Sequence, residues 1–278
     1  MKIAYVIDST VELHDSLKDH PDIYKIPVTI QIDEKEYLDG VNITNEELFH
    51  FMRDGKKKIT TSLPSVGKFV EMFETLLKDY DYVVALMLSS HLSGTYNSAS
   101  VAAQTVSDKV KVINTNLVSY PISYCLQKFI HLIKEHHLDK VVTIIEKMYE
   151  QNETYVVIEQ LDRLHKSGRL SDLSYYVGSL LNLAPVIMVQ EGKLKIKEKV
   201  RSSKKAKERM MGYLHQAHEK FQIKEVAVLY TVNKEEAKKY VESLKAKFQD
   251  IEFNIYPIGT AIGVHSGEYA LGIAWFKN

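Results

Sequence analysis

The chain has 278 residues, and its 36 acidic and 36 basic side chains give a formal net charge of zero. This balance provides no overall field that would favour nucleic acid or an anionic membrane as a partner. A single cysteine, Cys125, excludes internal disulfides and zinc sites built from several cysteines. No stretch approaches the roughly 20 apolar residues of a membrane span, and the first residues carry no signal-peptide pattern, so we expect a cytoplasmic protein.

Short apolar runs alternate with helical patterns in the first half of the chain. Strands are predicted at residues 3–7, 24–32, 82–88 and 110–114, and helices at 45–53, 66–78, 119–137 and 138–151. Pro27 favours an edge or start position for the second strand, and Thr44 followed by Glu47 predicts a capping box. Because helices between strands are typical of parallel sheets, we expect a mostly parallel sheet flanked by helices.

The second half has a different order of elements. Strands are predicted at 155–159, 184–190, 193–196, 225–230, 252–258 and 269–276, and helices at 161–166, 173–181, 203–221 and 234–248. Glu191-Gly192 separates two strands as a hairpin turn does, and Gly168 stands where a left-handed helix cap is expected. The predicted fold is therefore α/β with two packed domains, a first at 1–152 and a second, with a mixed sheet, at 153–278.

The segment Leu88–Ala99 is the most informative motif. A buried strand ends in a turn that is rich in hydroxyl groups and contains Gly94, and a helix follows. This order directs backbone N–H groups and hydroxyls at one point beside a helix N-terminus, which suits an anion or an acid group. Because no Gly-x-Ser-x-Gly elbow surrounds Ser93, we interpret Ser93 as a hydrogen-bond partner rather than a nucleophile, and His91 as a surface histidine.

Other polar residues are candidates for the same site, each with a simpler structural explanation. Asp8–Thr10 follows the first strand, at the end of an α/β sheet where ligands bind, but such residues also cap helices. Thr61 and Ser62 precede a proline turn that can aim them inward. Arg169 and Arg201 suit the capture of a carboxylate or phosphate, or are ordinary exposed arginines near helix ends.

His265 is the last candidate, because it lies between Gly263 and Gly267 in what we predict to be a glycine-rich loop. Such a loop leaves room for a small group, and we expect the pKa of this histidine to be near neutrality. Metal binding needs further ligands, and no paired His/Glu spacing provides them. We therefore expect neither a metal nor a cofactor.

Taken in order, these motifs resemble the DegV family of bacterial fatty-acid-binding proteins. The resemblance spans nearly the whole chain, and its most specific block is the Ser-Gly-Thr-Tyr-Asn-Ser-Ala sequence that begins at Ser93. The other matching blocks are Asp8–Thr10, Thr61–Ser65, Ser167–Arg169, Val200–Ser202 and Gly263–Gly267. The resemblance implies two α/β domains with an acyl chain buried in a tunnel between them.

The resemblance also implies roles for particular residues and partners. The residues that would hold the carboxyl end of the fatty acid are Thr61 or Ser62, Ser93, Gly94 and His265. Arg169 and Arg201 would lie near the mouth of the site or dock a partner. Such proteins present the bound fatty acid to a separate kinase, which makes acyl phosphate for phospholipid synthesis. The chain is therefore expected to be a carrier and not an enzyme, with transient contact to a membrane surface.

Two positions depart from the family pattern. Ala184 stands where the family often has a lysine, and Glu268 replaces part of a Gly-Pro-Gly-like turn, which places an acid near the expected carboxyl site. The apolar stretches 177–189 and 255–262 are candidates for the tunnel wall, although ordinary core packing explains them equally well.

Three other functions fit the same residues. Ser93 with His265 would suit a serine esterase or lipid hydrolase. A subunit resembling dihydroxyacetone kinase would attach a small ketone to His265. A carrier of another amphiphile, such as an isoprenoid or a lipidated signal, is the third alternative.

Overall fold

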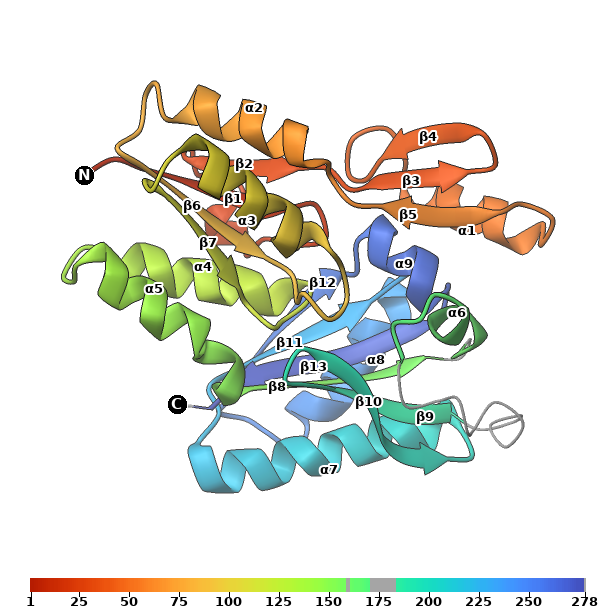
Figure 1. Ribbon diagram of the computed structural model, residues 1–278. Helices are drawn as coiled ribbons and strands as arrows, with labels where there is room; N and C mark the ends of the chain where they lie inside the picture. Colours follow the sequence, from red (N-terminus) through yellow and green to blue (C-terminus); the bar gives the residue numbers. More distant parts are fainter. Residues whose placement is uncertain (159–160, 171–183, 278) are drawn as a thin grey trace.

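Three β-sheets organise the computed structural model, which describes residues 1–158, 161–170 and 184–277 (Figure 1). A four-stranded and a three-stranded sheet use strands between residues 3 and 114, and a six-stranded sheet uses strands between 152 and 276. In Figure 1 the first two sheets form the upper part of the molecule and the third forms the lower part. The α/β class predicted from the sequence is confirmed.

The four-stranded sheet is entirely parallel. Its strand order is β2 (Ile23–Ile26), β1 (Ile3–Asp8), β6 (Tyr82–Met87) and β7 (Val110–Asn114). Helices α2 (Val66–Leu76) and α3 (Thr95–Val106) pack on one face, and α4 (Tyr120–Leu132) and α5 (Leu138–Glu146) pack on the other. Because both faces are covered, the central strands are continuous apolar runs.

The three-stranded sheet is antiparallel and was not predicted. Its order is β4 (Lys35–Leu38), β3 (Thr29–Ile32) and β5 (Ile59–Ser62), and α1 (Asn45–Arg53) packs against it. The single strand predicted at 24–32 is wrong. It is divided at Pro27-Val28 into β2 and β3, which belong to different sheets, because proline lacks the N–H that a continued ladder needs. The capping box of Thr44 and Glu47 at the start of α1 is confirmed.

The six-stranded sheet is mixed, as expected. Its order is β10 (Lys193–Val200), β9 (Ala184–Gln190), β8 (Asn152–Ile158), β13 (Ala270–Phe276), β11 (Glu225–Tyr230) and β12 (Glu252–Pro257), and only the β11–β12 pair is parallel. Helices α7 (Ser203–Phe221) and α8 (Lys234–Lys245) bury one face. The other face turns toward the upper part of the molecule, with α6 (Leu161–Lys166) and α9 (Thr260–Ser266) at its edge.

Short connections complete the chain. Two 3-10 turns, η1 (Asp15–Leu17) and η2 (Met148–Gln151), join longer elements. The predicted hairpin turn is confirmed, since Glu191 and Gly192 both have positive φ angles, 51° and 77°, as a type I′ turn requires. The predicted cap at Gly168 is also confirmed by its φ of 72°. The helix predicted at 173–181 lies outside the described residues.

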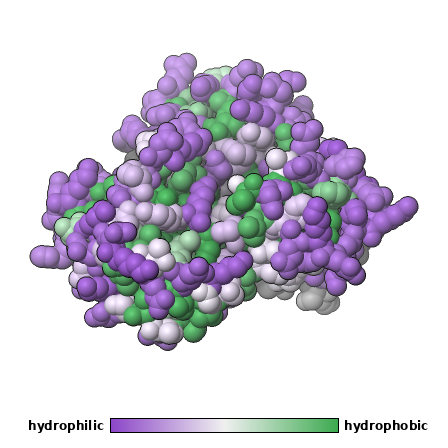
Figure 2. All heavy atoms as spheres, turned by 90° about the horizontal axis from the view of Figure 1, so that it is seen from above, coloured by the Kyte–Doolittle hydropathy of each residue, from purple (hydrophilic) through white to green (hydrophobic). Residues whose placement is uncertain are grey.

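The face of the molecule that is seen from above carries both hydrophilic and hydrophobic residues. Seen from above in Figure 2, hydrophilic residues cover most of the rim and hydrophobic residues show between them. His91 is exposed, as predicted, and Cys125 is fully buried. Within the described residues, no helix combines the length and the hydropathy that crossing a bilayer requires.

Candidate functional site

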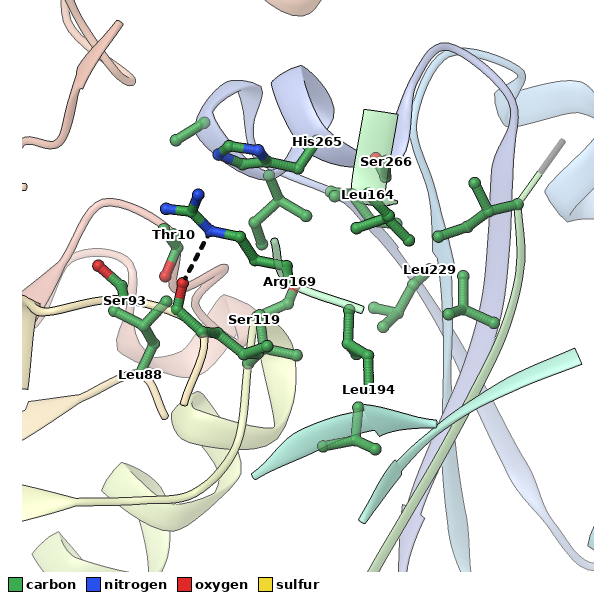
Figure 3. Close-up of a pocket in the computed structure, with 18 of the residues that line it drawn as sticks. Thr10, Leu88, Ser93, Ser119, Leu164, Arg169, Leu194, Leu229, His265 and Ser266 are labelled. Atoms are coloured by element: carbon green, nitrogen blue, oxygen red, sulfur yellow. Dashed lines mark hydrogen bonds between the residues drawn. The ribbon is translucent and has the colours of Figure 1, made fainter. Parts of the chain in front are cut away.

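A cavity lies between the upper and lower parts of the molecule (Figure 3). It holds about 970 Å³ of empty space, its open mouth included. Most of its wall is aliphatic, from both parts of the chain. Its apolar lining residues are Val28, Leu88, Leu92, Val118, Val156, Ile158, Leu164, Val189, Leu194, Leu229, Ile258, Ala261 and Ile262.

Thr61 and His265 meet in this cavity from opposite parts of the chain. Thr61 lies on β5 and His265 on α9, and Thr61 Oγ1 is 2.8 Å from His265 Nε2. Successive side chains of a strand point to opposite sides, so Ser62 is exposed and does not line the cavity. Of the two alternatives, Thr61 or Ser62, the structure places only Thr61 at the cavity.

The prediction that His265 lies in a loop is wrong, because Thr260–Ser266 forms helix α9. Gly263 allows α9 to pack closely against α1, because a Cβ at this position would lie 3.0 Å from Phe49 Cζ and 3.4 Å from Leu48 Cδ2. At its first turn, Ala261 N–H donates to the Asp39 carboxylate at 3.2 Å. The histidine therefore sits on a short helix that is held by the three-stranded sheet and α1.

Burial, and to a smaller extent the nearby positive charge of Arg169, lowers the pKa of His265 to about 4. The expected near-neutral pKa is thus wrong, because the glycines allow close packing and do not leave the ring in water. At pH 7 the imidazole is neutral. It can accept a hydrogen bond at one nitrogen and donate one at the other.

Arg169 lines the cavity directly after the cap at Gly168. Its Nε donates to the Leu92 carbonyl at 3.2 Å, the dashed line in Figure 3, and its Nη1 donates to the Ser167 carbonyl at 2.5 Å. Two backbone carbonyls from different parts of the chain therefore fix a positive charge at the cavity wall.

Ser93 lines the cavity, whereas its neighbour Gly94 does not. Ser93 Oγ lies 2.9 Å from Thr95 Oγ1 and accepts the Thr95 N–H at 3.3 Å. A Cβ at Gly94 would lie 2.9 Å from Leu63 Cδ2, the end of an exposed side chain in the β5–α2 loop.

The residues after β1 form a buried polar group behind the wall. Thr10 lines the cavity, and both its hydroxyl and its N–H donate to the carboxylate of Asp8, which is fully buried. Burial raises the pKa of Asp8, against the lowering effect of these hydrogen bonds. The hydroxyl of Ser9 donates to the carboxylate of Asp39, which also accepts the N–H of Ala261 in the first turn of α9.

Two residues that were expected near the site do not line the cavity. Arg201 is exposed and does not line the cavity. Glu268 does not line the cavity either, and its carboxylate pairs with Arg53 of α1, whose Nε lies 3.1 Å from both carboxylate oxygens. Sequence reasoning missed Ser119 and Thr154, which also line the cavity. The only signal for Ser119 was its position at the start of a predicted helix.

Only some residues of the two apolar stretches predicted as tunnel wall, 177–189 and 255–262, line the cavity. Val189 of the first stretch lines the cavity, as do three residues of the second, Ile258, Ala261 and Ile262. Residues 177–183 of the first stretch lie outside the described residues.

The fold and the cavity define a class of protein: an α/β chain whose interior site is apolar along most of its wall and polar where Thr61, Ser93, Arg169 and His265 meet the space. This chain belongs to the DegV family, whose model, described as "Uncharacterised protein, DegV family", matches residues 2–278.

Individual relatives match over 98% or more of their length. The DegV domain-containing protein TTE1491 of Caldanaerobacter subterraneus is 32% identical over 98% of both chains. The crystal structure of DegV, a fatty acid binding protein from Bacillus subtilis, is 30% identical, covers 100% of both chains and superposes with a TM-score of 0.89. The Streptococcus pneumoniae Fatty Acid Kinase (Fak) B3 protein, solved loaded with linoleic acid, is 20% identical over 100% of both chains with a TM-score of 0.86, which shows a shared fold.

Proposed function

We propose that this protein binds a long-chain fatty acid in the cavity between its two parts and presents the carboxyl group to a separate fatty acid kinase. The observation that carries the proposal is the uneven lining of the cavity. Aliphatic side chains form most of the wall, and the Thr61–His265 pair adds polar groups from both parts of the chain. The fatty acid binding stated for the Bacillus subtilis relative supports the same ligand class.

The energetics suit a fatty acid. Burying a 16-carbon tail at about 0.8 kcal/mol per methylene gives roughly 12 kcal/mol before costs. Lost translational freedom and ordering offset several kcal/mol of this gain. Tight binding therefore needs no strong ionic contact, and the polar groups at the cavity mainly set the orientation of the carboxyl group.

The polar groups can hold that carboxyl group without burying a new unpaired charge. The neutral His265 ring and the hydroxyls of Thr61 and Ser93 supply hydrogen bonds. The guanidinium of Arg169 faces the same cavity and favours the ionised carboxylate. We place the carboxyl group among these four side chains, with the tail along the aliphatic wall.

Presentation to a kinase is the finer part of the proposal. Transfer of a phosphoryl group needs the carboxylate oxygen to be reachable from outside, and the cavity has an open mouth. In this scheme the chain transfers no group itself. We propose that Arg169 and the exposed Arg201 contribute to docking the kinase, and that the two α/β units at 1–152 and 153–278 enclose the acyl chain.

Mass spectrometry tests the proposal directly. Protein purified from bacteria and then denatured should release a C14–C18 acid at close to one molecule per chain. Protein without such an acid that also takes up no added palmitic acid would overturn it. The kinase step is tested separately, by adding ATP and a bacterial fatty acid kinase and trapping acyl phosphate with hydroxylamine; its absence would remove the presenting role and leave binding intact.

The contacts of the described residues do not favour hydrolysis. A nucleophilic serine needs a base within hydrogen-bond reach and an acid behind that base. Here Ser93 contacts Thr95, and His265 contacts Thr61 with no carboxylate partner in the described part of the chain. An acyl-ester hydrolysis assay, compared between the wild type and Ser93→Ala, should therefore show no serine-dependent turnover.

A further inference from the structure

Ser119 differs from every other hydroxyl-bearing residue that lines the cavity. It is 3% exposed, and its Oγ has no hydrogen-bond partner among the described residues. The other hydroxyls of the lining each have a partner within the protein. These residues are Thr10, Thr61, Ser93, Thr154 and Ser266. A buried polar group without a partner is costly and calls for an explanation.

The position of Ser119 in the fold makes the lack of a hydrogen-bond partner unusual. Ser119 is the N-cap residue of α4, a place where a serine side chain usually accepts an N–H of the first turn. Here it makes no such bond, because the N2 residue, Pro121, has no N–H and the N–H of Ile122 at N3 donates to the Ser119 carbonyl at 3.1 Å. The φ of 63° and ψ of −141° of Ser119 belong to a region that favours glycine. Ser119 lines the cavity beside the positive end of the 13-residue helix α4 (Figure 3), and its buried hydroxyl is left without a partner among the described residues.

We propose that Ser119 is a second polar subsite, which binds an oxygen atom, as a hydroxyl or oxo group, on the acyl chain of the ligand. This inference rests on the proposed function, and it narrows the substrate class to fatty acids that carry oxygen along the tail as well as at the carboxyl end. Carbon chains without oxygen would press methylenes against this hydroxyl. An oxygenated chain would supply the partner that the hydroxyl lacks, with the helix end favouring the oxygen atom.

The chain offers a matched control for this idea. Ser100 of α3 also has a buried, unpartnered hydroxyl among the described residues, but it does not line the cavity. Ser119→Ala and Ser100→Ala therefore each remove a buried hydroxyl that has no partner among the described residues, and only the first of the two lines the cavity. Ser119→Gly is a second variant at the site, since glycine accepts the positive φ without strain.

The experiment measures dissociation constants for stearic acid and for a set of hydroxystearic acids that carry the hydroxyl at different carbons, by competition with a fluorescent fatty acid. The wild type should prefer one positional isomer. Ser119→Ala and Ser119→Gly should weaken that isomer by roughly fivefold to hundredfold, as for one buried hydrogen bond lost, while stearic acid binds equally or more tightly. The dissociation constant of the oxostearic acid with its oxygen at the same carbon then shows whether the subsite prefers a hydroxyl or an oxo group. Ser100→Ala should change none of these values.

The outcomes separate this inference from the proposed function. If stearic acid binds and every hydroxyl position weakens binding equally in the wild type and in Ser119→Ala, the subsite does not exist and fatty acid binding stands. That pattern would mean that Ser119 holds only a buried water. If neither stearic acid nor any hydroxystearic acid binds, the proposed function itself fails.

Discussion

At the scale of single residues, Thr61 and Ser62 form a natural comparison. They are neighbours on β5, yet Thr61 contacts His265 in the cavity and Ser62 is exposed. Thr61→Val keeps the shape of the side chain and leaves the imidazole of His265 without its hydrogen-bond partner. The loss of such a hydrogen bond costs about 1–3 kcal/mol. We expect palmitic acid to bind roughly fivefold to hundredfold more weakly to this variant.

Ser62→Ala is the control for that measurement, since it changes a hydroxyl one position away on the other side of the strand. Titration calorimetry with palmitic acid should give the wild-type dissociation constant for Ser62→Ala. Equal weakening by both variants would mean that β5 itself is disturbed, and wild-type binding by Thr61→Val would remove Thr61 from the site.

The depressed pKa of His265 predicts a specific dependence of stability on pH. In the unfolded chain histidine titrates near 6.5, whereas burial holds the pKa of His265 at about 4 in the folded protein. As pH falls from about 6.5 to 4, the unfolded state binds a proton at this histidine that the folded state does not bind, so acid favours unfolding. Over this window the contribution of His265 to the free energy of unfolding falls by about 3 kcal/mol, since each pKa unit corresponds to about 1.36 kcal/mol.

Urea unfolding of the wild type and His265→Gln between pH 7.5 and 4 tests this prediction. The wild type should lose more stability on acidification than His265→Gln does, because glutamine does not titrate. His91→Gln, at an exposed histidine, should follow the wild type. Parallel curves for the wild type and His265→Gln would contradict the shifted pKa.

At the scale of elements, two helical glycines predict opposite effects of the same substitution. Gly212 lies within α7, and a Cβ there would meet nothing within 4 Å. Gly212→Ala should therefore raise the free energy of unfolding by about 0.5–1 kcal/mol. Gly263→Ala on α9 pushes a methyl group against Phe49, whose side chain is fully buried, and should lower it by about 1–3 kcal/mol.

Denaturant unfolding of both variants, together with palmitic acid binding, tests this pair. Only Gly263→Ala should also weaken binding, because it displaces the helix that carries His265. A stabilised Gly263→Ala variant with wild-type binding would show that α9 can move away from α1 at no cost.

The same elements show what the sequence could predict. Strong local patterns were sufficient for α7 and β11, whose predicted bounds, 203–221 and 225–230, match the structure. The strands β4 and β5 were missed because they are short and largely polar, and their pairing with β3 is what makes them strands. The helix α9 was predicted as a loop for a related reason, since glycine at 263 reflects the proximity of Phe49, far away in the sequence.

The candidate site was predicted in the same uneven way. The motif blocks identified Thr61, Ser93, Arg169 and His265, all of which line the cavity. Sequence could not separate Thr61 from Ser62, because the choice depends on which face of an unpredicted strand each occupies. Glu268 was expected near the carboxyl site, and only the fold shows its pairing with Arg53.

At the scale of the whole molecule, the two parts of the chain are joined at several places around the cavity. At one, Ser89 Oγ donates to the Gly192 carbonyl at 2.7 Å, and the hairpin tip fits so closely that a Cβ at Gly192 would collide with Ser89. At another, Asn45 donates to the Ile258 carbonyl at 2.9 Å. Tyr120 stacks on Tyr256, with ring centroids 4.0 Å apart. Relative movement of the parts must break such contacts.

A ligand held between parts so joined should stabilise them together. Palmitic acid at a hundred times its dissociation constant adds about 2.7 kcal/mol to the free energy of unfolding, which corresponds to a rise in Tm of roughly 5–10 °C for a chain of this size. Calorimetry should show one transition that moves as a whole, and methyl palmitate, which lacks the acid group, should move it less. Two transitions, of which only one responds to palmitic acid, would mean that a single part of the chain holds the ligand. That result would contradict a site in this cavity, whose wall includes Thr61 from one part of the chain and Leu229 from the other.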